Sequence, residues 1–210
     1  STQLQEKTIV SPFNYDHAIE WIEKKGKEQY GQHFKIFEND KIVLIKLLCY
    51  FLKDVTIAGQ QSINLDKGIL LTGPVGCGKT TLMSLMRFFE PAESRFIVKS
   101  CREVSFEFIK DGYEIIHKYS RNSFIQPKAY CFDDLGTENN LKYFGNECNV
   151  MAEILLSRYD LFVSRKLRTH LTTNLSASEI EAVYGNRLRS RMRETFNLIS
   201  FQKDSTDKRA

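Results

Sequence analysis

One short stretch of the sequence has the residue types and the spacing of a phosphate-binding loop. It fits the pattern G-x-x-x-x-G-K-[ST] at every fixed position, after an apolar run and before a helical pattern. Glycines let the backbone curl with its N–H groups pointing inward, and the start of the helix adds partial positive charge. The predicted ligand is a nucleotide phosphate. The residues expected to bind it are Gly73, Pro74, Val75, Gly76, Cys77, Gly78, Lys79, Thr80 and Thr81.

Three side chains of this loop have individual expectations. Lys79 is expected to reach the terminal phosphates, and the Thr80 hydroxyl is expected to ligate Mg²⁺. Cys77 is a lone thiol beside the phosphates, so we expect bound ATP to protect it from alkylation. A chance glycine turn is the alternative, and both flanking segments argue against it.

A pair of carboxylates, Asp133 and Asp134, follows an apolar strand pattern at 129–132. Nucleotide hydrolysis needs one carboxylate that holds Mg²⁺ through its waters and often a second that orients the attacking water. Asp133 suits the first role and Asp134 the second. A strand that ends in a solvated acidic turn is the alternative, since such turns are common. The intact phosphate loop favours the catalytic interpretation.

The C-terminal third adds polar residues of two kinds. Asn174 follows an apolar strand pattern and could hold the attacking water or contact the γ-phosphate, or it could simply cap the next segment. An arginine that projects into a neighbour's phosphate site would stabilise transition-state charge, whereas a run of arginines can also form a solvated or nucleic-acid-facing surface. The arginines in question are Arg187, Arg189, Arg191 and Arg193.

Strand and helix patterns alternate from residue 68 onward, and they must position these residues. Apolar strands are expected at 68–72, 95–99, 129–132, 168–173 and 195–201. This alternation predicts an α/β three-layer fold with a mainly parallel five-stranded sheet. Ligands of such sheets bind at the carboxyl ends of the strands. The phosphate loop, the aspartate pair and Asn174 all lie at such ends, so we expect them to meet.

Punctuation between the strands sets the helix boundaries. Two S-x-x-E capping boxes, at Ser100 and Ser176, predict helix starts. A break at Asp111 and Gly112 splits the helical interval that follows the second strand, and 135–145 is expected to be an exposed loop. His170 lies inside a strand pattern and is interpreted as a hydrogen-bonded core residue rather than a catalyst.

Residues 1–60 are predicted to form a small helical N-terminal region and linker that could bind a partner, and residues 61–210 the nucleotide-binding domain. Within the first part, helices are expected from His17 to Tyr30 and from Lys41 to Lys53. The segment from Asp54 to Lys67 is polar and is expected to be a connection.

The composition is that of an ordinary soluble globular protein. The 210 residues are 42% hydrophobic and 27% charged, with a net charge of +4. No segment approaches the ~20 apolar residues of a membrane span, and the polar start does not resemble a signal peptide. The five cysteines form no C-x-x-C pair, which indicates buried thiols in a reducing compartment and gives no support for zinc. We therefore expect a cytoplasmic protein with no membrane partner.

Four motifs together resemble the AAA+ ATPases of the DnaC-like helicase-loader family and their relatives, the IstB-like transposition helper ATPases. The motifs are Gly73–Thr80, Cys131–Gly136, Thr172–Asn174 and Tyr184–Arg191. The resemblance implies an Mg²⁺-dependent ATPase with ATP and Mg²⁺ as cofactors. It implies that Asp133 is the Walker B metal residue, Asp134 the catalytic acid and Asn174 sensor 1.

The same resemblance implies that Arg191 is an arginine finger acting on the nucleotide of the next subunit, and that Arg209 is sensor 2. The expected partners are further copies in a ring or spiral, DNA, and a replicative helicase or a transposase. The initiator and loader branch carries an extra helical element between strands two and three. Positive charge for DNA phosphates is expected there from Lys110, Lys118, Arg121 and Lys128.

Two other functions fit the phosphate loop. A P-loop kinase acting on a nucleoside or nucleotide suits the chain length, but no arginine-bearing lid segment is visible. A nucleotide-gated DNA-binding protein with negligible turnover is suggested by Asp134, because the catalytic acid position more usually holds a Glu.

Overall fold

The computed structural model describes residues 11–120, 128–138, 141–143, 146–202, 205, 207 and 208, with the backbone alone at 141–143, 146 and 147. It divides the chain into two compact units, residues 1–65 and 66–210. In the part of the chain that it describes, no helix is long and apolar enough to cross a membrane.

The first unit is helical. Its elements are α1 (Tyr15–Tyr30), a 3-10 turn (Glu38–Asp40), α2 (Lys41–Phe51) and α3 (Val55–Gln60). The side chain of Asn14 caps α1 by accepting the backbone N–H of His17 at 3.0 Å. The prediction of a connection from residue 54 to 67 is wrong in its first half, because Asp54 accepts the N–H of Ile57 at 3.1 Å and so starts α3.

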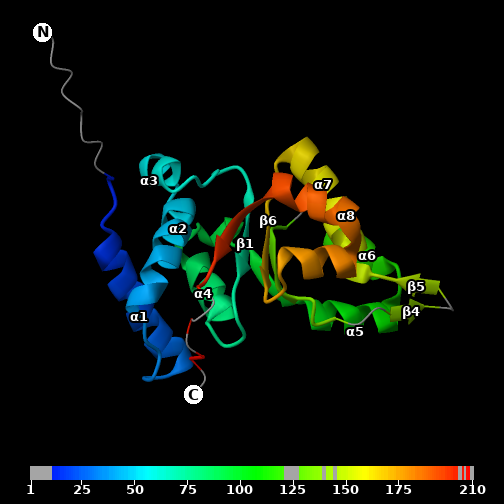
Figure 1. Ribbon diagram of the computed structural model, residues 1–210, viewed down its shortest axis with the longest axis horizontal. Helices are drawn as coiled ribbons and strands as arrows, with labels where there is room; N and C mark the ends of the chain where they lie inside the picture. Colours follow the sequence, from blue (N-terminus) through cyan, green and yellow to red (C-terminus); the bar gives the residue numbers. More distant parts are fainter. Residues whose placement is uncertain are drawn as a thin grey trace, which may run out of the picture. The chain divides into compact units, whose positions relative to one another are not determined.

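The second unit is built on a five-stranded sheet in which every neighbouring pair is parallel. The strands are β1 (Gly68–Thr72), β2 (Ile97–Ser100), β3 (Tyr130–Leu135), β6 (Thr169–Thr173) and β7 (Phe196–Ser200), in the spatial order β2-β3-β6-β1-β7. Figure 1 shows this sheet with helices around it. The predicted mainly parallel five-stranded α/β fold is confirmed.

Helices cover both faces of this sheet. They are α4 (Lys79–Met86), α5 (Cys101–Asp111), α6 (Glu114–Ser120), α7 (Val150–Arg165) and α8 (Ala177–Thr195). The helix α4 packs on β3 and β6, while α5, α6, α7 and α8 pack against one another (Figure 1). One hydrophobic cluster joins these four helices to the sheet residues Leu70, Phe132 and Leu171. The three-layer arrangement follows because each face of a buried parallel sheet needs a helical cover.

Three local expectations are corrected. The strand β3 does not end before the aspartate pair but runs through it to Leu135. The interval 135–145 is not simply a loop, since β4 (Leu141–Tyr143) pairs antiparallel with β5 (Asn146–Cys148). The helix α5 starts after Ser100 as predicted, but the Ser100 side chain forms no capping hydrogen bond, and the Glu103 carboxylate pairs with Lys99 at 2.7 Å.

Two other expectations are met. The helical interval is broken at Gly112, which has a φ of 63°. The imidazole of His170 is buried, and its Nδ1 accepts the N–H of Ile69 at 3.1 Å, so this histidine is a hydrogen-bonded core residue.

Candidate nucleotide and metal site

The carboxyl ends of β1, β3 and β6 bring the predicted site residues to one edge of the sheet. Thr173 of β6 is in register with Thr72 of β1 on one side and with Leu135 of β3 on the other. The phosphate loop leaves β1 directly after Thr72, and Asn174 leaves β6 directly after Thr173. The strand register therefore brings these segments, which are far apart in the sequence, to the same end of the sheet.

The phosphate loop has the backbone that its glycines predict. Gly76 and Gly78 have φ values of 83° and 95°, which side chains rarely adopt, and α4 begins directly at Lys79. The Lys79 side chain is 5% exposed, and its ammonium donates to the carbonyls of Gly73 and Pro74 at 2.8 Å each. The loop thus holds its cation over its own backbone, where phosphate oxygens would have to replace the carbonyls.

The thiol of Cys77 is fully buried beneath the loop, with its Sγ 4.0 Å from the Lys79 ammonium. The expectation that ATP shields this cysteine from alkylation needs a reachable thiol, so the structure contradicts its premise. All five cysteines are buried and free of disulfide bonds. Thiol chemistry is therefore not a probe of this loop in the folded protein.

The carboxylate of Asp133 is held by two threonine hydroxyls. Thr80 Oγ1 donates to it at 2.9 and 3.0 Å from the two carboxylate oxygens, and Thr172 Oγ1 donates to Oδ1 at 2.6 Å. Burial raises the pKa of Asp133, and the two hydroxyl bonds act in the opposite sense. The two threonine hydroxyls therefore orient a buried carboxylate beside the loop.

Thr80 and Asp133 offer the donor set that Mg²⁺ prefers. A hydroxyl and a carboxylate are hard oxygen ligands, and Mg²⁺ usually takes one or two such protein ligands while keeping several waters. Across the described residues there is no cluster of three or more histidine, cysteine or acidic side chains suited to a metal. The residues present therefore fit an ion shared with a bound phosphate better than a closed protein-only site.

Asp134 sits on a β-bulge. Phe132 pairs with Leu171 and Leu135 pairs with Thr173, so two residues of β3 lie opposite the single residue Thr172. Asp134 has a φ of 55°, in the left-handed region that aspartate tolerates better than most residues. In a regular strand, two consecutive side chains point to opposite faces of the sheet. The bulge breaks this alternation at Asp133 and Asp134.

Thr172 is a further candidate site residue, which lies within one of the sequence motifs but for which no role was predicted. Its hydroxyl donates to Asp133 and also accepts the backbone N–H of Asp134 at 2.9 Å. One buried oxygen thus fixes both aspartates. The available signal was a threonine within an apolar strand pattern, whose hydroxyl needs a partner once buried.

Asn174 is exposed at the end of β6, where a side chain can reach a ligand bound at the phosphate loop. Its neighbour Thr173 accepts the N–H of Leu175 at 3.0 Å and donates to the carbonyl of Leu135 at 2.6 Å. These bonds fix the turn that carries Asn174 relative to β3. The sensor 1 role stays a prediction.

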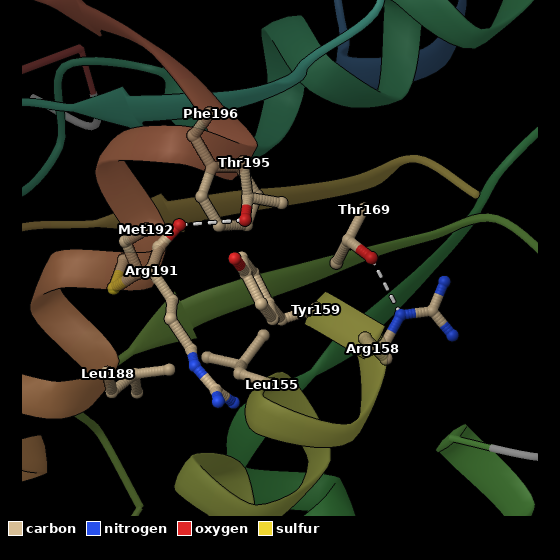
Figure 2. Close-up of a pocket in the computed structure, with 9 residues that line it drawn as sticks. All are labelled: Leu155, Arg158, Tyr159, Thr169, Leu188, Arg191, Met192, Thr195 and Phe196. Atoms are coloured by element: carbon tan, nitrogen blue, oxygen red, sulfur yellow. Dashed lines mark hydrogen bonds between the residues drawn. The ribbon is translucent and has the colours of Figure 1, made fainter. Parts of the chain in front are cut away.

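Arg191 lies far along α8, near the opposite edge of the sheet from the phosphate loop. The helix leads into Phe196, the first residue of β7, which pairs with Gly68 at the start of β1. Figure 2 shows Arg191 beside Tyr159 of α7, and its guanidinium carbon lies 4.6 Å from the centre of that ring. The structure does not bring Arg191 to the phosphate loop of its own chain, so a role in catalysis requires another copy.

The other arginines of this segment differ in their surroundings. Arg189 forms an ion pair with Glu181, one turn before the kink of the same helix, while Arg187 and Arg193 are exposed. A cation–π contact holds Arg191 alone among the described arginines of this run. Arg191 is thus the arginine of this run whose guanidinium packs on an aromatic ring.

Arg209 lies outside the described residues, so its predicted sensor 2 role stays a prediction. The neighbouring residue Lys208 does contact the phosphate loop, since its backbone N–H donates to the carbonyl of Gly76 at 3.0 Å. Arg121 also lies outside the described residues. Among the cations expected to face DNA, Lys118 pairs with Glu107 at 2.9 Å, whereas Lys110 and Lys128 are exposed.

No family model matches the chain. Two curated proteins share local sequence with it. The Fe(3+) ions import ATP-binding protein FbpC of Photobacterium profundum is 39% identical over 59 residues, 27% of this chain and 17% of that protein. ABC transporter B family member 1 of Arabidopsis thaliana is 32% identical over 107 residues, 49% of this chain and 8% of that protein. The chain spans less than a fifth of the length of either relative.

Solved structures match over most of the chain. The DnaC helicase loader superposes with a TM-score of 0.56 at 16% identity, covering 80% of this chain and 92% of that one. DnaI gives 0.54 at 17% identity, with coverage of 80% and 87%. AMPPCP-bound DnaA from Aquifex aeolicus gives 0.53 at 18% identity, with coverage of 84% and 50%.

These likenesses show the fold: the chain shares its three-layer α/β architecture with the DnaC helicase loader, DnaI and DnaA. The resemblance to helicase-loader ATPases, predicted from four motifs, is confirmed as a likeness of fold.

Proposed function

We propose that the chain binds ATP and Mg²⁺ and hydrolyses ATP at a site that a neighbouring copy completes. The observation that carries this proposal is the buried Asp133 carboxylate, which two threonine hydroxyls orient beside an intact phosphate loop. Thr80, one of the two donors, is also the loop residue whose hydroxyl suits Mg²⁺. The AMPPCP named with the DnaA structure supports ATP as the nucleotide.

Each residue then has a defined task. Lys79 exchanges its carbonyl partners for phosphate oxygens, while Thr80 and Asp133 hold Mg²⁺, which neutralises phosphate charge when it is bound. Asp134 orients the attacking water and accepts its proton. Asn174 contacts that water or the terminal phosphate from the adjoining strand end.

Arg191 acts on the nucleotide of the next copy. Its position near the far edge of the sheet from its own phosphate loop supports a role between subunits, where a guanidinium would stabilise charge in the transition state. The assembly is a ring or spiral of identical chains, because a head-to-tail contact of this kind repeats.

The wider role is that of a helicase loader that assembles on DNA. The fold shared with the DnaC helicase loader and DnaI supports this role over a nucleotide kinase. The helical unit before residue 66 binds the partner protein. Capture experiments with the full chain distinguish the possible partners, because recovery of a transposase instead of a replicative helicase assigns the chain to transposition.

Mixing two inactive variants tests the shared site. Lys79→Ala and Arg191→Ala are each expected to lose ATP turnover at least about 100-fold, as removal of a charge-stabilising group does. In a random equimolar mixture about a quarter of interfaces pair an intact loop with an intact arginine, so turnover returns to about a quarter of the wild-type rate. A mixture as inactive as its components contradicts the shared site. Turnover that persists in Asp134→Asn contradicts the proposed chemistry.

A further inference from the structure

The helix α8 is kinked at Gly185, directly before its arginine-rich half. Gly185 has φ and ψ values of 83° and 158°, a conformation that is essentially restricted to glycine. Apart from the adjoining residues and the helix's own backbone, no atom of the described residues lies within 4 Å of where a Cβ would be, so the backbone conformation requires glycine here. Gly185 therefore joins two separately anchored halves of α8: contacts of Val183 and Tyr184 hold the half before the kink, and the buried Leu188 and Met192 hold the half after it.

Two side chains from outside the helix hold Val183 and Tyr184. The hydroxyl of Tyr184 donates to the carboxylate of Glu138, and the side-chain amide of Asn149 donates to the carbonyl of Val183 at 3.3 Å. Tyr184 is 8% exposed, so its hydroxyl would have little access to water if this partner were removed. We call Glu138 and Asn149, with the two residues that they bind, the kink clamp.

Glu138 belongs to the turn that follows β3. Its carboxylate also accepts the N–H of Gly136 at 2.9 Å, and Thr137 Oγ1 donates to the carbonyl of Asp134 at 2.7 Å. The turn is packed against the end of the next strand, since a Cβ at Gly136 would lie 2.5 Å from the Leu175 side chain. A continuous set of bonds thus runs from Asp134 through Glu138 to Tyr184.

Asn149 reaches the kink from a second direction. Its Oδ1 accepts the N–H of Ala152 at 3.0 Å and so caps α7, which fixes the orientation of the amide group. The amide nitrogen is thereby directed at the Val183 carbonyl. Two independent elements, the turn after β3 and the start of α7, therefore meet at one kink.

We propose that Glu138 and Asn149 are positioning residues that fix the arginine-bearing half of α8 relative to Asp134. The contacts that carry this role are to α8 and to the turn after β3. Their effect on turnover is through Arg191, so this part of the inference rests on the proposed function. Rearrangement of the turn beside Asp134 is transmitted to the neighbour's site through these hydrogen bonds.

Two subtle variants test the clamp in the full chain. Tyr184→Phe removes one hydroxyl and keeps the ring, and Asn149→Asp removes the amide donor but keeps the capping oxygen. Matched controls exist in the N-terminal unit. Tyr15→Phe also removes a tyrosine–carboxylate hydrogen bond, to Asp54 at 2.9 Å, and Asn14→Asp is the same change at the cap of α1.

The first readout is amide hydrogen exchange of residues 186–193. We expect exchange there to rise about 10-fold in Tyr184→Phe and in Asn149→Asp, while residues 79–86 and both controls keep wild-type exchange. This readout needs no catalysis. Unchanged exchange of 186–193 in both clamp variants overturns the clamp, whatever the enzyme does.

The second readout is steady-state ATP turnover. Tyr184→Phe is expected to lower kcat about 10-fold with KM unchanged, and Tyr184→Phe combined with Arg191→Ala is expected to be no slower than Arg191→Ala alone. Losses that multiply in the double variant overturn positioning through Arg191. If Arg191→Ala has no effect while exchange still rises, the proposed intersubunit role fails and the clamp stands as a structural device.

Discussion

The hydroxyl of Thr172 donates a hydrogen bond to the Asp133 carboxylate at 2.6 Å and accepts the backbone N–H of Asp134 at 2.9 Å. Few single atoms in the described site serve two candidate catalytic residues at once. Its loss leaves a buried carboxylate with one fewer donor and a buried N–H without an acceptor, and each of these is costly.

Thr172→Val, which preserves shape, is therefore expected to lower ATP turnover at least about 10-fold and to destabilise the protein by about 1–3 kcal/mol. Turnover at several Mg²⁺ concentrations and urea unfolding measure the two effects. Thr172→Ser keeps the hydroxyl and should retain most activity. A fully active valine variant would show that the hydroxyl does not orient the aspartates.

At the residue scale, the sequence predicted those groups whose role depends on a local pattern. The loop from Gly73 to Thr80 is recognised directly from spacing, because its chemistry is carried by consecutive residues. Thr172, Glu138 and Tyr184 act through contacts between segments far apart in the chain, and no local pattern encodes such contacts.

At the scale of elements, the Arg158 side chain of α7 joins several segments through hydrogen bonds to backbone carbonyls and a threonine hydroxyl. Its guanidinium donates to the carbonyls of Tyr119 and Lys128 at 2.7 and 3.0 Å, and its Nε donates to Thr169 Oγ1 at 2.7 Å, a bond drawn in Figure 2. The side chain is 2% exposed, and burial lowers its pKa to about 10, so it stays protonated at neutral pH.

Arg158→Met is expected to destabilise the protein by about 2–4 kcal/mol, because buried carbonyls at the end of α6 and before β3 lose their donors. The measurement is urea unfolding followed by circular dichroism. Arg165→Met, on the exposed last turn of the same helix, should change stability by less than about 0.5 kcal/mol. Equal stability of the two variants would contradict the role assigned to Arg158.

Element boundaries show why some of the prediction failed. The capping box at Ser176 forms as expected, with Ser176 and Glu179 each accepting the other's backbone N–H. The same pattern at Ser100 gives no side-chain capping bond, and Glu103 there forms an ion pair with Lys99. Likewise Asp54 starts α3 in a segment whose polar composition indicated a connection. In both cases an acidic side chain at the helix start binds a partner in the folded chain, and composition alone does not show that partner.

At the scale of the whole molecule, a net charge of +4 gives little reason to expect DNA binding, so the placement of charge matters more. Lys110 and Lys128 are exposed, whereas the Lys118 ammonium pairs with Glu107 at 2.9 Å. Partial neutralisation by this carboxylate reduces what Lys118 can offer a phosphate.

If the second unit binds DNA through this region, Lys110→Ala and Lys128→Ala are expected to weaken binding and each to reduce the salt slope by about 1. Lys118→Ala should have a smaller effect. Fluorescence anisotropy with labelled DNA at several salt concentrations measures both quantities. A loss in Lys118→Ala equal to that in Lys110→Ala would contradict this ranking.

The global arrangement was the most predictable feature. Alternating strands and helices allow few topologies once crossovers are right-handed, and the parallel five-stranded sheet followed from them. The meeting of the phosphate loop, Asp133 and Asn174 at one edge is a consequence of the same rule. The position of Arg191 near the amino ends of the strands could not be predicted from the sequence, because it depends on the length of α8 and on its kink.

Two backbone carbonyls of the phosphate loop already accept hydrogen bonds from the Lys79 ammonium, so a bound phosphate must compete with them. The ammonium is satisfied by the carbonyls of Gly73 and Pro74, so nucleotide affinity is the difference between two sets of charged hydrogen bonds. Anions too weak to displace both carbonyls gain little there. We therefore expect inorganic anions, which gain nothing from base or ribose contacts, to bind this loop more weakly than a nucleotide does.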